Sequence, residues 1–214
     1  MSKAERLLQR QFAHIRNIDP SIIIPSQERY KYTIKDMTSG GIFRLNNATY
    51  LVLEVGAYIE TDESFTKTLD WTGHELKVFC LETGHIHNLE WEEDDEIDVS
   101  LTLSEVEFSK LQYDDGEAIA ADSDDLDEIV DKGWEIKLLG ELFTYKDDYA
   151  AWYTREGSDK REKVYFYDFE AEDGRELSIE TWISENEKEA FQVFISQEVH
   201  PDDIEVMVIG SPNR

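Results

Sequence analysis

The chain has 214 residues, of which 40% are hydrophobic and 12% aromatic, and its formal net charge at pH 7 is −28. This apolar content is enough for a sizeable core, which excludes a disordered chain, and the length fits one large β domain or two small ones. The first 44 residues hold eight Lys and Arg against four Asp and Glu, which leaves a net charge of −32 on residues 45–214. This charge excludes direct nucleic-acid binding by residues 45–214, because a protein binds phosphates through Lys and Arg side chains that neutralise them.

The compartment is indicated by the cysteine count and by the lack of targeting signals. Cys80 is the only cysteine, so an intramolecular disulfide is impossible and a reducing compartment fits. The N-terminal residues lack the apolar run and cleavage site of a signal peptide, and no stretch has the length of a membrane span. We therefore expect a cytoplasmic, bacterial protein without a membrane span.

Residues 1–25 are predicted to form a basic amphipathic helix and a linker. Apolar residues recur at helical spacing over residues 3–18, and Pro20 ends the pattern. The candidate interaction surface of this helix consists of Leu7, Phe12 and Ile15. The helix can pack on its own sheet, dock onto a partner or join a second copy of the chain as a homodimer.

Residues 26–111 are predicted to form a first β half. Residues 49–55 alternate as a strong strand that continues to Glu60, and a polar loop at 61–73 contains Trp71. A hairpin at 74–92, with its turn at Thr83–Gly84, and a strand at 97–103 complete this half.

An acidic linker at 112–133 separates this half from a second β half at 134–210. Within the linker, Ser123 or an adjacent Asp can cap a short helix that Gly133 ends. In the second half we expect one strand at 134–142, two strands around a turn at 146–148 and a strand at 190–195. Between them lies the strongest hairpin signal of the chain, residues 163–183 around Asp173–Gly174.

The two hairpins indicate an internal duplication. A shift of ninety positions carries Gly84 onto Gly174 and Glu90 onto Glu180, and several matches in one order favour a degenerate repeat. The predicted fold is therefore mainly β, with α+β character at the margins. Two similar antiparallel halves would form a pseudo-symmetric sandwich or a pair of half-barrels, with a short N-terminal helix and a short linker helix.

The second half also carries a family resemblance. A strand entering Gly140, the aromatic strand at 167–169, the turn glycine Gly174 and the strand at 177–182 follow one another. This order resembles an uncharacterised bacterial family, domain-of-unknown-function family 4178, over residues 33–208 and most strongly over 134–182. Members of that family are often encoded near phage-shock-type membrane-stress proteins. The resemblance implies an accessory role in a stress- or envelope-related system, with no established activity.

Two sets of polar residues are candidate sites. His85 and His87 share one face of a strand, and with Glu90 or His74 they can hold Zn²⁺. A solvent-facing pair is the favoured interpretation, because the second half lacks histidines at the matching positions. The matched carboxylates Glu90 and Glu180 can share a proton or a cation, or each can pair with a base across the sheet.

No catalytic residue and no cofactor are predicted, because the chain lacks the usual catalytic and phosphate-binding motifs. Aromatic residues beside acids suit contact with a basic or quaternary-amine surface, although core packing between sheets also explains them. These residues are Tyr149, Trp152 and Tyr153.

The function predicted from these features is a non-enzymatic, acidic protein-interaction module of a bacterial stress- or envelope-associated system. Its protein partner would be basic or membrane-associated. The alternative is a small-ligand or cation sensor that binds metals or polyamines between the two halves. A further alternative is a nucleic-acid mimic, which requires acidic groups aligned along one elongated face.

Overall fold

The computed structural model describes residues 3–94 and 96–210 and is mainly β, as predicted. It contains two compact units, which are described separately. Unit 1 comprises residues 1–54, 78–86 and 201–214, and unit 2 comprises residues 55–77 and 87–200. The helices are α1 (Lys3–Arg16), α2 (Ser123–Lys132) and the short 3₁₀ helices η1 (Pro20–Ile22), η2 (Ser26–Lys31), η3 (Ile34–Asp36), η4 (Phe108–Lys110) and η5 (Pro201–Asp203). The strands are β1 (Ile42–Leu45), β2 (Ala48–Thr61), β3 (Thr68–Cys80), β4 (Ile86–Glu93), β5 (Ile97–Val106), β6 (Leu111–Tyr113), β7 (Ile136–Leu138), β8 (Glu141–Arg155), β9 (Arg161–Ala171), β10 (Arg175–Ile183), β11 (Glu189–Glu198) and β12 (Glu205–Val208).

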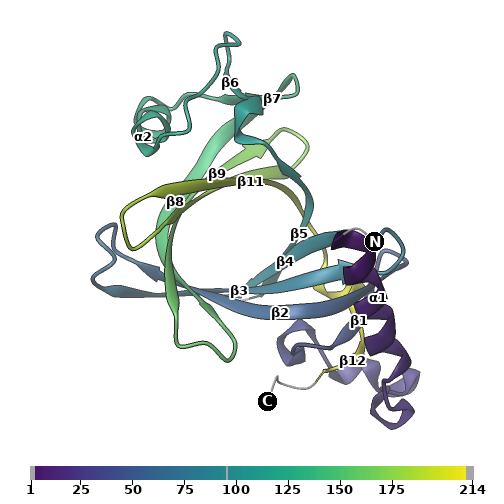
Figure 1. Ribbon diagram of the computed structural model, residues 1–214. Coiled ribbons are helices and arrows are strands. Elements are labelled where there is room, and N and C mark those ends of the chain that lie inside the picture. The colour runs from purple at the N-terminus through teal and green to yellow at the C-terminus, as the bar shows by residue number, and fades with distance from the viewer. Residues whose placement is uncertain (1–2, 95, 211–214) are drawn as a thin grey trace. The chain divides into compact units, whose positions relative to one another are not determined.

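Unit 2 is built around a closed, antiparallel, eight-stranded barrel, which Figure 1 shows as a ring of strands. The strand order is β2-β3-β4-β5-β11-β10-β9-β8. The ring is closed by the pairing of β2 with β8, from Gly56 opposite Arg155 to Thr61 opposite Ala150. Closure gives every barrel strand two neighbours, so that its backbone groups are hydrogen-bonded on both sides.

The barrel strands come from two meanders, β2–β5 and β8–β11. The meanders join each other twice, through the β5–β11 pairing and through the β2–β8 pairing. They therefore form one barrel wall rather than the two packed sheets of a sandwich.

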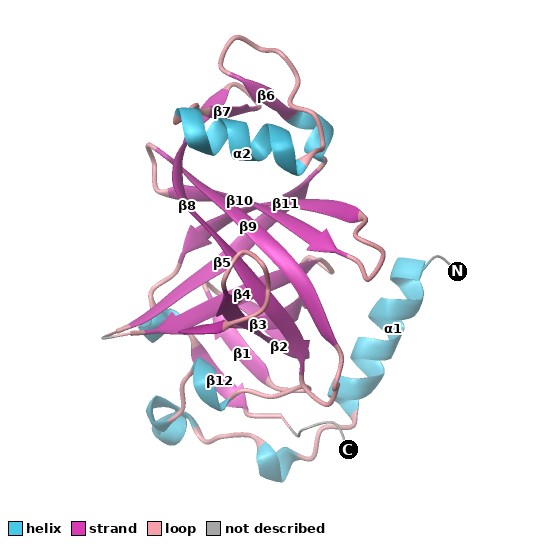
Figure 2. Cartoon of the chain, turned by 90° about the vertical axis from the view of Figure 1, so that its left-hand side faces the viewer, coloured by secondary structure: helices cyan, strands magenta, loops and turns pink. Residues whose placement is uncertain are grey.

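Helix α2 covers part of the outer surface of the barrel. Asp122 caps the helix by accepting a hydrogen bond from the backbone N–H of Asp124, and Gly133 ends it in the left-handed conformation, at φ 63°. Leu126 and Ile129 on its inner face are fully buried. They share a core with apolar residues of β7–β11, among them Phe143, Tyr167, Phe169, Leu177, Ile179 and Val193. In Figure 2, α2 lies beside the short strands β6 and β7. The predicted linker helix is thus confirmed.

Unit 1 contains α1, β1, β12 and the first part of β2. Its core includes Ile42, Leu51, Phe79 and Val208, against which Ile15 of α1 packs. Packing on its own unit is therefore the observed role of Ile15, whereas Phe12 is 43% exposed. The side chain of Leu7 lies outside the described part of the chain, and a homodimer through α1 remains a prediction.

Both predicted hairpins are confirmed. Strands β9 and β10 pair from Glu170–Glu176 to Lys163–Ile183 around the Asp173–Gly174 turn. The turn glycines Gly174 and Gly84 have positive φ angles of 80° and 74°, a conformation that favours glycine because any other residue brings its Cβ close to the backbone.

Three local predictions in these segments are wrong. Residues 143–155 form a single strand, because a β-bulge between Tyr145 and Asp147 accommodates the charged stretch that resembled a turn. Residues 134–142 do not form one strand, because a turn at Leu139–Gly140, where both φ angles are positive, follows β7. Trp71 lies inside β3, which begins at Thr68 rather than after residue 73.

Within the described residues, no helix has the length and apolar character needed to cross a membrane.

Candidate ligand-binding site in the barrel

Side chains alternate between the two faces of the barrel strands, and several carboxyl groups face inward beside apolar and aromatic ones. On β10, Leu177 and Ile179 point into the outer core beneath α2. Because successive side chains of a strand face opposite sides, their neighbours Ser178 and Glu180 face the interior. The same rule places Asp168 of β9 inside, since it lies directly opposite Ser178 in the register.

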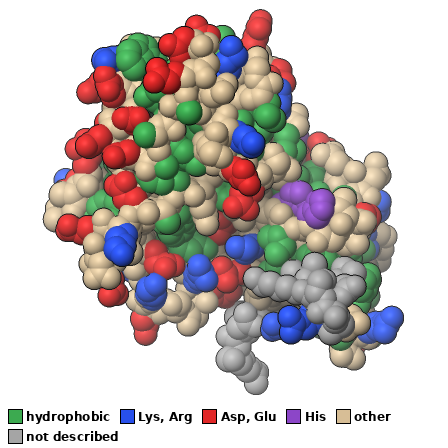
Figure 3. Space-filling model, turned by 45° about the horizontal axis from the view of Figure 1, so that its top comes forward, with side chains coloured by type: hydrophobic (Ala, Val, Ile, Leu, Met, Phe, Trp, Pro, Cys, Tyr) green, Lys and Arg blue, Asp and Glu red, His purple; other side chains and the backbone are tan. Residues whose placement is uncertain are grey.

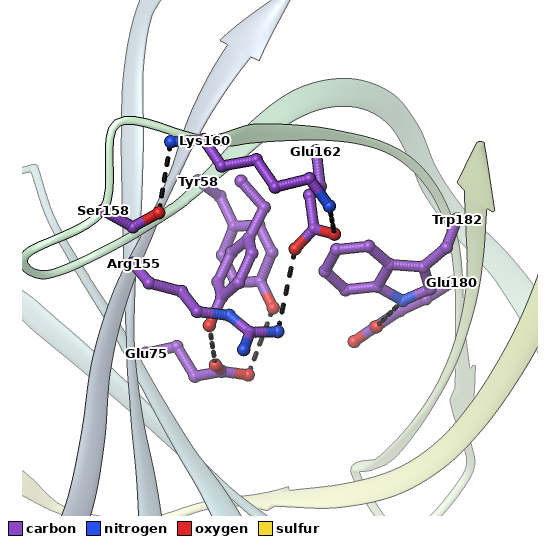
Figure 4. Close-up of polar contacts among 9 residues, drawn as sticks. Tyr58, Glu75, Arg155, Ser158, Lys160, Glu162, Glu180 and Trp182 are labelled. Atoms are coloured by element: carbon purple, nitrogen blue, oxygen red, sulfur yellow. Dashed lines mark hydrogen bonds and ion pairs between the residues drawn. The ribbon is translucent and has the colours of Figure 1, made fainter. Parts of the chain in front are cut away.

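Glu75 on β3 is the centre of a buried hydrogen-bonded group. Its carboxylate accepts one hydrogen bond from the hydroxyl of Tyr58 on β2, at 3.1 Å, and one from the hydroxyl of Tyr153 on β8, at 2.8 Å. Glu75 is 6% exposed, and each tyrosine is 3% exposed. Burial, followed by the nearby carboxylates of Glu180 and Glu75, raises the pKa of Tyr58 well above its ordinary value. Figure 4 shows the ring of Tyr58 beside the carboxylate of Glu75.

Glu180 on β10 is the second buried carboxyl group and is 2% exposed. It accepts a hydrogen bond of 2.7 Å from the indole N–H of Trp182 on the same strand (Figure 4). Burial, followed by the nearby Glu75, raises the pKa of Glu180 to about 8, although the hydrogen bond from Trp182 acts to lower it. The group is therefore largely protonated near neutral pH.

Glu90 on β4 and Asp168 on β9 complete the set. Burial, followed by the neighbouring carboxylates of Glu75 and Glu180, raises the pKa of Glu90 well above its ordinary value. Burial also raises the pKa of Asp168 to about 7, against a hydrogen bond with Ser178 that lowers it. Within the described part of the chain, the side chain of Glu90 makes no hydrogen bond or ion pair. The four carboxyl groups come from four different strands.

Three cationic side chains lie near this group, namely Lys77, Lys146 and Arg155. Lys146 forms an ion pair with Glu176, and Arg155 forms one of 3.7 Å with Glu162. Lys77 lowers the pKa of Glu180, but it is the last of the five causes that act on that group. Lys146 likewise lowers the pKa of Asp168, so positive charge partly compensates these two inner carboxyl groups.

Aromatic rings fill part of the remaining interior. Tyr149 stacks on Phe166, with ring centroids 4.6 Å apart, and Trp71 meets Tyr149 edge-on at 5.2 Å. Tyr149 and Trp182 are only half-buried, as are Glu90 and Asp168. Since these side chains face inward and still retain accessible surface, solvent reaches between them.

The predicted histidine site is not assembled. His85 is exposed in the turn before β4, whereas His87 is half-buried with Nδ1 2.8 Å from the carbonyl oxygen of Thr102. His74 stacks on Trp91, with ring centroids 3.9 Å apart. Over residues 3–94 and 96–210, no three His, Cys, Asp or Glu side chains come together as a metal would require. His85, His87 and Glu90 are thus not brought together.

The predicted aromatic surface patch is wrong for two of its three members. Tyr153 is buried and bonded to Glu75, and Tyr149 faces the same interior. Trp152 points the other way, because it lies between them in the strand alternation, and it contacts Phe65 at 5.7 Å.

The matched pair Glu90 and Glu180 does face one interior, and each raises the pKa of Tyr149 there. Sequence reasoning missed Tyr58, Glu75 and Asp168. The available signal was the recurrence of acids and aromatic residues at alternate positions of these strands, on the side opposite the outer core.

The comparisons with known proteins identify a family but no characterised relative. The model of a family described as "Domain of unknown function (DUF4178)" matches residues 38–201, more than half of the chain. No curated protein and no solved structure matches significantly.

Proposed function

The chain belongs to the DUF4178 family, and we propose that its function is located in the barrel of unit 2. The region that the family model matches includes every strand segment of that barrel. In this proposal the barrel binds a positively charged organic molecule between its strands. The observation that carries this proposal is the set of four inward carboxyl groups, Glu75, Glu90, Asp168 and Glu180. The sequence predicts a cation sensor as an alternative function, with the binding site between the two halves. The present proposal keeps the cation as ligand and places its site in the barrel interior.

The chemistry of the interior favours a cation. Lys77 and Lys146 compensate the inward carboxyl groups of Glu180 and Asp168 only in part, since the pKa values of both groups stay raised. An entering cation adds counter-charge and favours the ionised form of these groups. An ammonium group donates hydrogen bonds to carboxylates, and aromatic faces attract it as well. Tyr149 and Trp182 supply such faces beside the carboxyl groups. The ligand would thus be held by charge, hydrogen bonds and ring contacts together.

An organic cation fits better than a metal ion. A metal ion needs several ligands converging at about 2.0–2.6 Å, and across the described ranges no three candidate side chains are grouped closely enough. Charges spread over four strands instead suit a molecule with some extent.

The experiment that tests this proposal is a thermal-shift and calorimetric screen of the full chain against organic ammonium compounds at pH 7.5. A ligand that binds only the native state raises Tm by mass action, by more at higher ligand concentration. Glu180→Gln should reduce the shift, and Glu128→Gln, which removes an exposed charge on α2 outside the barrel, should leave it unchanged. If no ammonium compound raises Tm or releases heat, the proposal is wrong.

The protein-interaction module in a bacterial stress- or envelope-associated system is the second candidate. It is supported by the exposed Phe12 and by the exposed Arg6, Arg10 and Arg16 of α1. Capture of partners from the cytoplasm of the native host, with the full chain and with a chain lacking residues 1–20, would test it. A partner that requires α1 supports this function, whereas identical captures argue against it.

Two further proposals concern the acids and the repeat. Nucleic-acid mimicry requires aligned acids, but on the face in Figure 3 the acidic side chains are dispersed among hydrophobic, neutral and basic ones.

The pseudo-symmetric duplication draws support from the two four-stranded meanders, β2–β5 and β8–β11. The first strands of the two meanders, β2 and β8, pair with each other, and so do their last strands, β5 and β11. The duplication would make Glu90 on β4 and Glu180 on β10 equivalent.

A further inference from the structure

We propose that Leu139, at the turn between β7 and β8, is an apolar knob that docks onto helix α1 of a second copy of the chain. This contact is separate from the cation site in the barrel and does not depend on it. The strained backbone of Leu139, the exposed face of α1 and the opposite charges of the two segments support it.

The turn after β7 holds a leucine in a backbone conformation that disfavours it. Leu138 pairs with Glu141 across the turn, and the two residues between them, Leu139 and Gly140, have positive φ angles of 54° and 91°. Two-residue turns of this kind favour Asn, Asp or Gly. A leucine in the left-handed region is strained, because its Cβ approaches the following carbonyl oxygen.

The turn between β1 and β2 shows the ordinary solution within the same chain. Leu45 pairs with Ala48 across that turn, and the two residues between them are Asn46 and Asn47, with φ angles of 50° and 64°. Asparagine therefore serves this backbone elsewhere in the molecule, and the turn itself does not require a leucine at position 139.

Packing within its own chain does not compensate the strain at Leu139. Its side chain is 82% exposed, more than any other exposed large hydrophobic residue of the described chain. Leu142, which follows the turn on β8, is also 38% exposed. A single exposed leucine is ordinary, but a strained one that its own core does not use indicates a contact outside the chain.

Helix α1 offers a matching exposed face. While Ile15 packs into the core of unit 1, four other residues of the helix are exposed, namely Gln9, Phe12, Ala13 and Arg16. Residues three and four positions apart lie together on a helix surface, so these four surround one shallow site with the small Ala13 in it. A leucine knob fits a site of this kind, formed by four residues of a facing helix.

The charges of the two segments are complementary. Residues 111–142, which contain the turn, hold eleven Asp and Glu against two Lys, whereas residues 1–44 hold eight Lys and Arg against four acids. Arg6, Arg10 and Arg16 of α1 are exposed. Opposite charges favour the contact of the turn with α1, and like charges disfavour α1 against α1 or turn against turn. The occupant of the knob is therefore the α1 of another copy.

A contact between two different surfaces is heterologous. Each copy carries one turn and one helix α1, so a copy that has lost one of them can still associate through the other. This property separates the proposed contact from a symmetric one.

The test is sedimentation equilibrium of the full chain over roughly a hundredfold range of concentration, in about 50 mM and about 500 mM NaCl. At the lower salt the mean mass should rise with concentration above the 24.9 kDa of a single chain, and the higher salt should weaken the association. Leu139→Asn should raise the dissociation constant about tenfold. The same variant should raise Tm, because asparagine adopts the left-handed region more readily, so that unfolding cannot explain the loss.

A second variant changes the other side of the contact. Ala13→Glu places a long acidic side chain in the site on α1 and should weaken the association about as much, while glutamate keeps the helix. An equimolar mixture of the two variants should be heavier than either variant alone, because one supplies an intact α1 and the other an intact knob.

Ile86→Thr is the matched control, since it removes another exposed apolar side chain, 42% exposed at the start of β4, and should leave the dissociation constant unchanged. A single-chain mass at every concentration, or unchanged association in Leu139→Asn, would overturn the proposal. So would a mixture no heavier than its components, or an equal loss in Ile86→Thr. A lower Tm in Leu139→Asn would likewise overturn it, because the leucine would then stabilise its own chain.

Discussion

Tyr58 and Tyr153 lie directly opposite each other in the β2–β8 register that closes the barrel, and both hydroxyls donate to the single carboxylate of Glu75. Their rings are 4.8 Å apart. The bonds thus link three strands, β2, β3 and β8, at the closing seam. The seam and the candidate ligand site share this group of residues, so stability and binding can be tested together.

Glu75→Ala should lower the free energy of unfolding by about 3 kcal/mol. The substitution leaves two buried tyrosine hydroxyls without an acceptor, and each unsatisfied group costs about 1–3 kcal/mol. Urea denaturation measures the change. In a Tyr58→Phe/Tyr153→Phe background the same substitution should cost clearly less, because no hydroxyl is then left unpaired. An equal cost in both backgrounds would mean that the bonds to Glu75 do not stabilise the seam.

Stability should fall as pH rises from about 5 to 8. The pKa values of Glu180 and Asp168 are raised to about 8 and about 7, from ordinary values of 4.5 and 3.8. At a pH between the unfolded and the folded pKa of such a group, the folded protein holds a proton that the unfolded chain has released. The stabilisation from that group is therefore fully present below its unfolded pKa and is lost as pH rises through its folded pKa. Each such proton contributes a slope of about 1.4 kcal/mol per pH unit.

Urea denaturation at pH 5, 6, 7 and 8 measures this dependence. Glu180→Gln should make the fall in stability with pH less steep between pH 5 and 8, by about 1.4 kcal/mol per pH unit, since glutamine does not titrate. Glu128→Gln, at an exposed position of α2, is the matched control and should retain the slope of the unmodified chain. A Glu180→Gln variant with an unchanged slope would contradict the assignment of the raised pKa.

Gly56→Val should destabilise the barrel by about 2 kcal/mol. A Cβ at position 56 would lie 2.5 Å from Cε2 and from the hydroxyl oxygen of Tyr153, so the ring must move and its bond to Glu75 is disturbed; overpacking of this kind costs roughly 1–3 kcal/mol. Thermal denaturation of Gly56→Val in a Tyr153→Ala background tests the cause. The added cost should largely disappear there, and its persistence would assign the effect to the backbone.

Gly174→Ala should lower the free energy of unfolding by about 1 kcal/mol. Gly174 occupies the turn between β9 and β10 at φ 80°, and a Cβ there meets no atom within 4 Å. The cost is therefore conformational, of roughly 1–2 kcal/mol for a non-glycine residue in the left-handed region. Gly174→Asn should cost less than Gly174→Ala, because asparagine visits this region more readily. Equal costs, measured by urea denaturation, would contradict this explanation.

Local sequence signals determined the elements whose cause is local. The Asp173–Gly174 hairpin, the helix capped at Asp122 and ended at Gly133, and the apolar alternation of the main strands were all predicted, because turn chemistry, capping and side-chain period act within a few residues. The same kind of signal failed at Lys146–Asp148, where a charged stretch was taken for a turn. There the pairing with β9 overrides the local preference and produces a bulge instead.

Only the tertiary structure decided the closure of the barrel and the assembly of its interior. The pairing of β2 with β8 joins residues about a hundred positions apart, and backbone hydrogen bonding can be satisfied by several strand orders with the same local pattern. The sequence supplied Glu90 and Glu180 as a matched pair, but it could not say that Glu75 and Asp168 face the same interior. Closure of the barrel places carboxyl groups from distant parts of the chain on one inner face. Burial on that face raises the pKa values of Glu90, Asp168 and Glu180.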